Sequence, residues 1–315
     1  MIAPPQGKRR PGRTGPEEVD ATPRLVRAYT VWPARNTFCC YGHCMTGPKE
    51  DFGPNVCAWA TILGIIALFF YVWGLTLVRV SVPLLVFLSS AFISTIVWFL
   101  ATSFTDPGII PRNPNPGALA QMPPLYQNRV EDGRTVTDTW CTTCSIYRPP
   151  RASHCPDCDN CVRDFDHHCP FTRNCIGARN YPFFILFLVS VSISLGGLIF
   201  SCFVLAGSVE LNDGVLDPRA YPWQLNGFIN TALIFAAIAL ALVLWGFTAY
   251  HLTLLITGFT TKERLKGRKN GAKSISIVER VACLEPSELE PRRKIPNPES
   301  LSKMGNIPTI KASEL

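Results

Sequence analysis

The sequence CTTCSIYRPPRASHCPDCDNCVRDFDHHCPFTRNC, residues 141–175, decides how the central part of this chain folds. It holds seven of the chain's 13 cysteines and three of its five histidines. A structural zinc site takes four Cys or His side chains in a tetrahedron. The spacing C-x2-C-x9-H-C-x2-C-x2-C-x4-D-H-H-C-x5-C therefore supplies two Cys3His sites. The candidate ligands are Cys141, Cys144, His154, Cys155, Cys158, Cys161, His168 and Cys175.

This assignment leaves His167 and Cys169 without a metal to bind. A free thiol has a pKa near ~8.5 and is only a few per cent ionised at neutral pH. His167 is a candidate base, and Asp166 is placed to orient its imidazole, as in other Cys–His systems. We therefore expect Cys169 to be a nucleophile. In the alternative, Cys169 binds zinc and one other cysteine is spare, which would break the symmetric ligand count.

Four long apolar stretches flank this window. Hydrophobic residues make up 47% of the chain, and the mean hydropathy is +0.17. The stretches are 56–78, 80–104, 181–209 and 228–257. Each reaches the ~20 residues that cross a bilayer, and so many rarely occur in a soluble fold, where they would be buried helices. We predict an all-α polytopic membrane protein: four transmembrane helices, with a cytosolic cysteine-rich two-zinc module between helices 2 and 3.

The basic residues predict the topology, because cytoplasmic loops are enriched in Lys and Arg. Twenty-eight Lys or Arg residues lie on the side of the two termini and the Cys/His window, and only Arg79 and Arg219 lie on the other. Both termini are therefore expected in the cytosol. The expected division is an N-terminal region 1–55, partly disordered; a transmembrane hairpin 56–104; a cytosolic loop 105–180 with the zinc module at 139–180; a second transmembrane pair 181–257; and a cytosolic tail 258–315.

The predicted location narrows the possible functions. Clustered thiols in the reducing cytosol are typical of metal ligands or nucleophiles rather than disulfides. The net charge of +7 suits an anionic cytoplasmic leaflet. The ligand spacing does not fit a Cys2His2 finger, so no nucleic-acid partner is expected. The four stretches contain no Asp, Glu, Lys or Arg, which argues against an ion transporter.

Three motifs make the chain resemble the DHHC protein S-acyltransferases. Asp166-His167-His168-Cys169 lies in a cysteine-rich loop between the second and third of four spans. Asp106-Pro107-Gly108 follows the second span, and Thr260-Thr261-Lys262-Glu263 follows the fourth, as the family's D-P-G and T-T-x-E motifs do. The resemblance covers roughly Asn36 to Gly267. Phe171 departs from the Trp that many members carry, but an aromatic ring is retained.

The resemblance implies an enzyme that transfers a long acyl chain from palmitoyl-CoA to protein cysteines, through an acyl-enzyme on Cys169 with His167 as acid and base. The acyl chain is expected among the four spans. Arg148, Arg151, Arg173 and Arg179 are candidates for the CoA phosphates, although each alone is more simply a surface charge. The family's zinc pairing implies two structural Zn²⁺ ions, held by Cys141, Cys144, His154 and Cys161 and by Cys155, Cys158, His168 and Cys175.

The expected partners follow from two further motifs. Asn36-Thr37-Phe38-Cys39-Cys40 and Arg148-Pro149-Pro150-Arg151-Ala152-Ser153 resemble the branch that modifies Ras-type GTPases with an accessory subunit. We therefore expect membrane-associated substrates with an accessible Cys, a cytosolic accessory subunit, and an endoplasmic reticulum or Golgi membrane. The tail departs from this branch, because it keeps only Cys283. His251, near the cytosolic end of the fourth span, is expected to be interfacial rather than catalytic. A non-enzymatic zinc scaffold remains the alternative, and it would need neither Cys169 nor His167.

Overall fold

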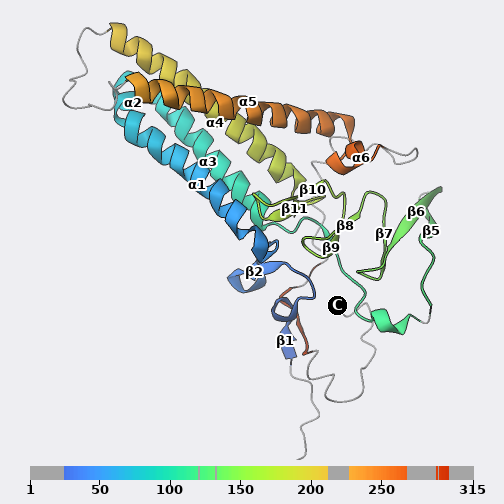
Figure 1. Cartoon of the computed structure of the whole chain (residues 1–315). Coiled ribbons are helices and arrows are strands. Elements are labelled where there is room, and N and C mark those ends of the chain that lie inside the picture. Colours follow the sequence, from blue (N-terminus) through green and yellow to red (C-terminus); the bar gives the residue numbers. More distant parts are fainter. Residues whose placement is uncertain are drawn as a thin grey trace, which may run out of the picture.

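The computed structural model describes residues 25–119, 121–131, 133–211, 227–267, 289 and 291–297. The first residues of the N-terminal region, where disorder is expected, lie outside this set, and so does most of the tail 258–315. Four helices are long and apolar enough to cross a membrane: Lys49–Gly74, Val82–Phe104, Tyr181–Leu205 and Ile234–Thr257. The predicted fold class is confirmed, because the cysteine-rich module lies between the second and third of them (Figure 1).

The helices are arranged as a bundle beside the module (Figure 1). A π-helical turn, Phe70–Gly74, joins α1 to α2, and Ser81 then separates the first span from the second. The Ser81 hydroxyl accepts a hydrogen bond from the Leu84 amide, which caps the next helix. The helices are α1 Phe52–Phe69, α2 Leu75–Val80, α3 Val82–Phe104, α4 Tyr181–Leu211, α5 Gly227–Thr257 and α6 Thr261–Leu265.

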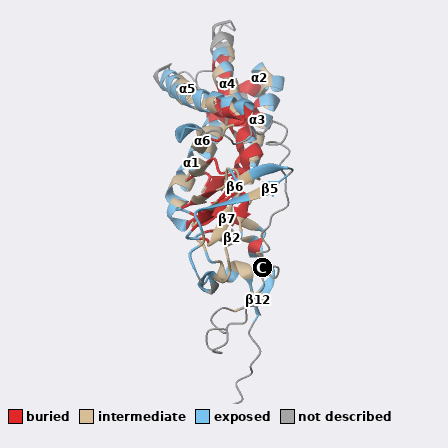
Figure 2. Ribbon diagram, turned by 90° about the vertical axis from the view of Figure 1, so that its right-hand side faces the viewer, coloured by how far each residue is buried: buried red, intermediate tan, exposed pale blue. Residues whose placement is uncertain are grey.

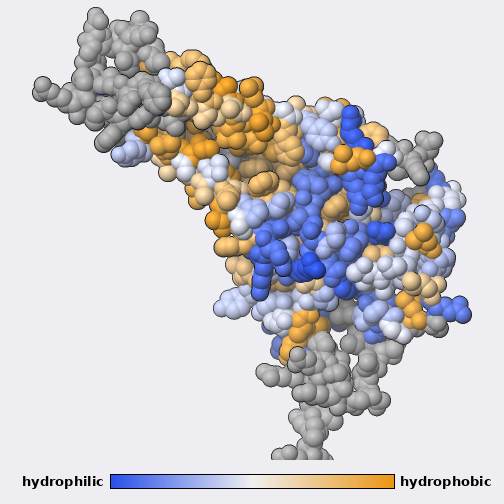
Figure 3. All heavy atoms as spheres, in the orientation of Figure 1, coloured by the Kyte–Doolittle hydropathy of each residue, from blue (hydrophilic) through white to orange (hydrophobic). Residues whose placement is uncertain are grey.

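Helix α4 is the centre of the bundle, packing against α3 on one side and α5 on the other. Small polar side chains link these helices: the Ser94 and Ser190 hydroxyls lie 2.9 Å apart, and the Ser192 and Thr248 hydroxyls also lie 2.9 Å apart. Such hydrogen bonds help to join helices where lipid removes the usual hydrophobic driving force. The outer surface of the helices is hydrophobic, whereas that of the module is largely hydrophilic (Figure 3).

The residues outside the helices, which include the module, form short strands, and buried residues lie along the interior of this part (Figure 2). Two three-stranded sheets have the orders β4-β9-β8 and β5-β6-β7, and β10-β11, β2-β3 and β1-β12 form two-stranded ones. The strands are β1 Leu25–Arg27, β2 Thr37–Cys39, β3 Cys44–Thr46, β4 Ile109–Ile110, β5 Tyr126–Glu131, β6 Arg134–Cys141, β7 Ile146–Arg148, β8 Ser153–Cys155, β9 Asn160–Val162, β10 His167–Cys169, β11 Asn174–Ile176 and β12 Lys294–Pro296.

Buried amides fix the module to the end of α3. The Asn174 side-chain amide donates to the carbonyls of Ser103 and Thr105, at 3.2 and 2.9 Å. The Asn180 amide donates to the Thr102 carbonyl at 3.2 Å and to the Cys175 carbonyl at 2.8 Å. Both asparagines are fully buried. The β10-β11 hairpin is therefore held at one end of the membrane bundle.

The D-P-G motif makes the turn from α3 into the module. The Asp106 carboxylate accepts hydrogen bonds from the amides of Gly108 and Ile109, each at 2.9 Å. It also pairs with Arg179 at 2.8 Å. Gly108 has φ +102°, a backbone conformation that favours glycine. This motif therefore has a structural role, joining the second span to the residues just before the third.

Candidate active site and metal centres

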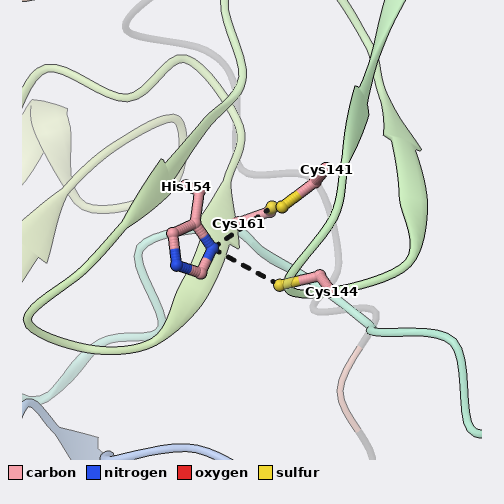
Figure 4. A group of neighbouring side chains, drawn as sticks. All are labelled: Cys141, Cys144, His154 and Cys161. Atoms are coloured by element: carbon pink, nitrogen blue, oxygen red, sulfur yellow. Dashed lines mark hydrogen bonds between the residues drawn. The ribbon is translucent and has the colours of Figure 1, made fainter. Parts of the chain in front are cut away.

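The eight predicted metal ligands lie in two groups of four. Within each group the candidate ligand atoms all lie within 4.8 Å of one another. In the first group, made of Cys141, Cys144, His154 and Cys161, His154 Nδ1 lies 3.5 Å from the Cys144 sulfur and 3.8 Å from the Cys161 sulfur (Figure 4). A Zn–S bond of about 2.3 Å implies spacings of about 3.8 Å between ligands of a tetrahedral site. This donor set therefore fits zinc.

The second group consists of Cys155, Cys158, His168 and Cys175. His168 Nδ1 lies 3.5 Å from the Cys158 sulfur and 3.6 Å from the Cys175 sulfur. The Cys158 and Cys175 sulfurs lie 3.5 Å apart. Both groups thus supply a closed set of three thiols and one imidazole, as structural zinc sites do.

Strand register explains which ligands belong together. His154 pairs directly with Cys161 across β8 and β9, and His168 pairs with Cys175 across β10 and β11. Directly opposed residues of an antiparallel pair project from the same face of the sheet. Each hairpin therefore presents one histidine and one cysteine to one metal. The two C-x2-C turns, Cys141 to Cys144 and Cys155 to Cys158, complete the sites.

A carboxylate lies behind each zinc-facing histidine. Asp51 Oδ2 lies 2.8 Å from His168 Nε2, and Asp159 Oδ1 lies 3.6 Å from His154 Nε2. Such a partner fixes the tautomer that leaves Nδ1 free for the metal. Neither aspartate was expected from the sequence. Asp51 is 117 residues away from its histidine in the sequence, so no local motif could have revealed the contact.

The opposite face of β10 carries the two residues that the zinc sites do not use. His167 and Cys169 flank His168, and side chains two residues apart in a strand share a face. His167 Nδ1 lies 2.9 Å from Asp166 Oδ2, and the same imidazole forms a hydrogen bond with the Cys169 thiol. Because Asp166 takes Nδ1, Nε2 is the nitrogen available to the thiol. The predicted Asp–His–Cys line is thus assembled.

The electrostatics of this line favour an ion pair. Burial disfavours the His167 imidazolium, but the Asp166 carboxylate and the Cys169 sulfur outweigh burial and raise the pKa of His167 to about 9. Burial likewise opposes ionisation of Cys169, yet the His167 hydrogen bond and charge lower the pKa of the thiol below its usual value. A thiolate beside an imidazolium is the reactive form of a cysteine nucleophile.

The T-T-x-E motif, which closely follows the C-terminal end of the fourth span, orients Asp166. The Thr261 amide donates to Asp166 Oδ1 at 2.9 Å, and the Thr261 hydroxyl donates to Asp166 Oδ2 at 2.6 Å. Thr260 and Glu263 form a capping box that starts α6 and sets the direction of Thr261. These bonds and His167 overcome the burial of Asp166, which favours the neutral acid, and lower its pKa to about 2. The role of Thr261 was not expected, although the capping-box pattern is visible in the sequence.

An apolar cavity of about 710 Å³ opens beside Cys169. Helices α1, α3, α4 and α5 supply most of its wall, and His167, Cys169 and Phe171 line its module end. This volume is in the range of small-molecule sites. A second cavity of about 160 Å³ shares Ile65, Leu195 and Leu240 with the first. The bundle can therefore take a long apolar chain whose head lies at Cys169.

His251 belongs to the surroundings of the site, whereas its place in the sequence predicted an interfacial position. It is 1% exposed, and its ring centroid lies 5.9 Å from that of His167. Phe184 packs against both rings, at 5.5 Å from His167 and 5.0 Å from His251. The sequence shows that His251 lies near a helix end, but not on which side of that helix strand β10 packs. For this reason its position beside His167 could not be predicted.

All four arginines expected as candidates for the CoA phosphates have partners inside the protein, and Arg148 donates to the Thr139 carbonyl at 3.5 Å. Arg151 bridges Asp164 at 2.8 Å and Glu263 at 3.4 Å. Arg173 donates to the Pro48 carbonyl at 2.8 Å, and Arg179 pairs with Asp106. Their main contacts therefore join separate segments of the protein. These contacts give Arg151, Arg173 and Arg179 a structural role, which differs both from binding a phosphate and from the solvated surface charge that was the alternative.

The comparisons with known proteins agree with this arrangement. The family model "DHHC palmitoyltransferase" matches residues 134–268. Palmitoyltransferase ZDHHC9 of Homo sapiens and that of Bos taurus are each 34% identical over 309 residues, covering 89% of this chain and 83% of the relative. Palmitoyltransferase ZDHHC8 of Mus musculus is 34% identical over 260 residues, covering 78% of this chain and 32% of the relative. The chain therefore belongs to the DHHC palmitoyltransferase family.

Proposed function

We propose that this protein is a protein S-palmitoyltransferase that works through an acyl-enzyme on Cys169. The observation that carries the proposal is the Asp166–His167–Cys169 line at one end of the apolar cavity. A zinc scaffold needs neither the spare thiol nor the cavity. The two zinc sites have closed ligand sets, so their role in this proposal is structural: the first holds β8 and β9 together, and the second holds β10 and β11 in place.

The reaction has two steps. The Cys169 thiolate attacks the thioester carbon of palmitoyl-CoA, the bond from that carbon to the CoA sulfur breaks, and CoA leaves with a proton from His167. A substrate cysteine then gives its proton to His167, and its sulfur takes the acyl group. Cys169 is released as the thiolate. Asp166, held by Thr261, keeps the imidazole oriented and stabilises its cation in both steps.

The two parts of palmitoyl-CoA suit different surroundings. The acyl chain would enter the cavity, because burial is favourable by ~0.8 kcal/mol per CH2. The CoA phosphates would lie over basic side chains on the module. Arg148 remains a candidate for this role, because its contact with the Thr139 carbonyl is long, at 3.5 Å. Burial and the positive charges of Lys266 and Arg148 lower the pKa of Lys262, so these three basic side chains lie near one another. This basic cluster, Arg148, Lys262 and Lys266, is our candidate for the phosphates.

The four spans make this a multi-pass membrane protein, so its acceptors are proteins at a lipid bilayer. The excess of Lys and Arg on one side supports a cytosolic location for both termini and the module. We place the protein in the endoplasmic reticulum or Golgi membrane, with Ras-type GTPases as substrates and a cytosolic accessory subunit. The support for these assignments is the resemblance carried by Asn36–Cys40 and by Arg148–Ser153.

A turnover experiment tests the proposal. Protein reconstituted in vesicles is given palmitoyl-CoA, and free CoA is measured with and without a membrane-anchored peptide that contains one cysteine. We expect a burst of about one CoA per chain without the peptide, then steady turnover with acyl transfer once it is added. If the protein retains zinc but releases no CoA under either condition, also with candidate accessory subunits, the scaffold alternative is correct.

A further inference from the structure

A third group of thiols lies outside the two zinc sites. Cys39 and Cys40 end β2 and begin the turn after it, and Cys44 begins β3. Their sulfurs all lie within 4.8 Å of one another, the same limit that both zinc groups meet. Cys39 and Cys44 are directly opposed in the register, so they project from the same face of the hairpin. Three thiols from one short turn thus converge.

The backbone here repeats a feature of the zinc-binding turns. In the two C-x2-C turns, the residue after the second cysteine is left-handed: Ser145 has φ 53° and Asp159 has φ 56°. Tyr41, which follows Cys40, has φ 56°. This conformation is unfavourable for residues other than glycine and is kept where something holds it. The turn at Cys40 therefore shares this left-handed residue with the other two, although Cys40 itself is also left-handed, with φ 50°.

The hairpin is fixed to the module at its base, and at its tip His43 accepts a hydrogen bond from Arg292. At the base, the Thr46 hydroxyl and the Gly47 amide both donate to the Arg173 carbonyl at 2.6 Å, and Met45 packs among the residues of the second zinc site. At the tip, the Cys39–Cys44 pair closes a ladder of three residue pairs. A hairpin this short is marginally stable without further support. A metal bound by all three thiols would supply that support.

The donor set selects the kind of ion. Three sulfurs without a carboxylate favour a thiophilic cation such as Zn²⁺. The neighbouring His43 is engaged elsewhere, because its Nε2 accepts a hydrogen bond from Arg292 at 2.9 Å. Cys40 is exposed, so a fourth position can take water. We propose that Cys39, Cys40 and Cys44 bind a third zinc ion and release their thiol protons to solvent.

Zinc stoichiometry tests this site without using activity. The full chain is purified in detergent with a thiol reductant, equilibrated with Zn²⁺ and gel-filtered, and zinc and protein are then quantified. We expect about three zinc ions per chain in the wild type and about two in Cys44→Ser and in Cys40→Ser. Cys57→Ser, an exposed cysteine of α1 outside all three groups, is the matched control and should keep three.

Two results would overturn the proposal. One is a wild-type chain that binds only two zinc ions after equilibration, with Cys44→Ser indistinguishable from it. The other is mass-spectrometric detection of a thioester or disulfide at these three cysteines in most of the molecules, because either would remove the ligands. If Cys44→Ser fails to fold, Cys40→Ser decides, since Cys40 is exposed and its loss leaves the packed base of the hairpin intact.

Discussion

The two faces of strand β10 carry the same residue types, cysteine and histidine, in different roles. On one face, His168 joins three cysteines in a closed set that fits zinc. On the other, His167 and Cys169 have no metal partners among the described residues and face an apolar cavity. The strand pleat alone separates them, because alternate side chains point to opposite faces. This comparison shows that the neighbours of a Cys–His pair decide its role. Further thiols around it make a zinc site, whereas a carboxylate and an apolar cavity make a nucleophile.

The largest effect on folding and activity is expected from removing a zinc ligand on the His168 side of the β10-β11 pair. Cys175→Ala removes a fully buried ligand, and zinc binding supplies roughly 10–16 kcal/mol to small zinc domains. We expect the second zinc to be lost, the module to unfold, and acyl transfer to disappear. Zinc content and thermal unfolding measure this, with Cys202→Ser as a control in the bundle. A Cys175→Ala protein with full zinc content and activity would show that this residue is not a ligand.

The next largest effect separates activity from folding. In Cys169→Ser the nucleophile is lost, so acyl transfer should fall by at least about 10³-fold. The zinc content and the unfolding temperature should stay within error of the wild type, because Cys169 belongs to neither metal group. Activity, metal analysis and thermal unfolding are measured on one preparation. Loss of zinc from this variant would mean that the two faces are not independent.

A smaller effect is expected from the residue that orients the carboxylate. Thr261→Val removes the hydroxyl hydrogen bond to Asp166, and a bond to a charged group contributes about 1.5–3 kcal/mol. We expect kcat to fall by about 10-fold or more, and Thr261→Ser to restore most of it. Thr253→Val is the matched control, because the Thr253 hydroxyl donates within its own helix, to the Ala249 carbonyl at 2.8 Å. Equal losses in Thr261→Val and Thr253→Val would contradict the assigned role.

The smallest effect on activity is expected from the carboxylate that contacts a zinc-binding histidine. Asp51→Ala removes the carboxylate beside His168, and such changes weaken metal binding by about 10–100-fold. Zinc should leave this variant at lower chelator concentration, while activity in excess zinc stays near the wild-type level. Glu50→Ala is the control, because Glu50 is the exposed residue next to Asp51. An unchanged chelator titration would show that Asp51 does not support the site.

Much of this arrangement could be predicted from the sequence. Zinc ligand spacing and hydrophobic length are local patterns, so the order of residues alone reveals the two metal groups and the four spans. The division into scaffold and nucleophile followed from counting ligands. That count could not show why His167 and His168 differ, because the difference depends on the register of β10 with β11.

The remaining contacts are between residues far apart in the chain. Asp51 reaches His168 across 117 residues, and Thr261 reaches Asp166 across 95. The cavity wall combines residues from four helices, and His251 lies against His167 only because α5 and the module pack together. Such contacts depend on tertiary packing, which no short motif encodes. The D-P-G motif illustrates the same point, since its partner Arg179 lies beyond the last zinc ligand, Cys175.

Acyl-enzyme formation tests the central claim most directly. Wild-type protein and Cys169→Ser, each with its zinc quantified, are incubated with labelled palmitoyl-CoA and then treated with neutral hydroxylamine, which cleaves thioesters. We predict about one hydroxylamine-labile label per wild-type chain on the peptide that contains Cys169, and none on that peptide in Cys169→Ser at unchanged zinc content. Full acyl transfer to a substrate by Cys169→Ser, or a wild-type label confined to another cysteine, would contradict the account.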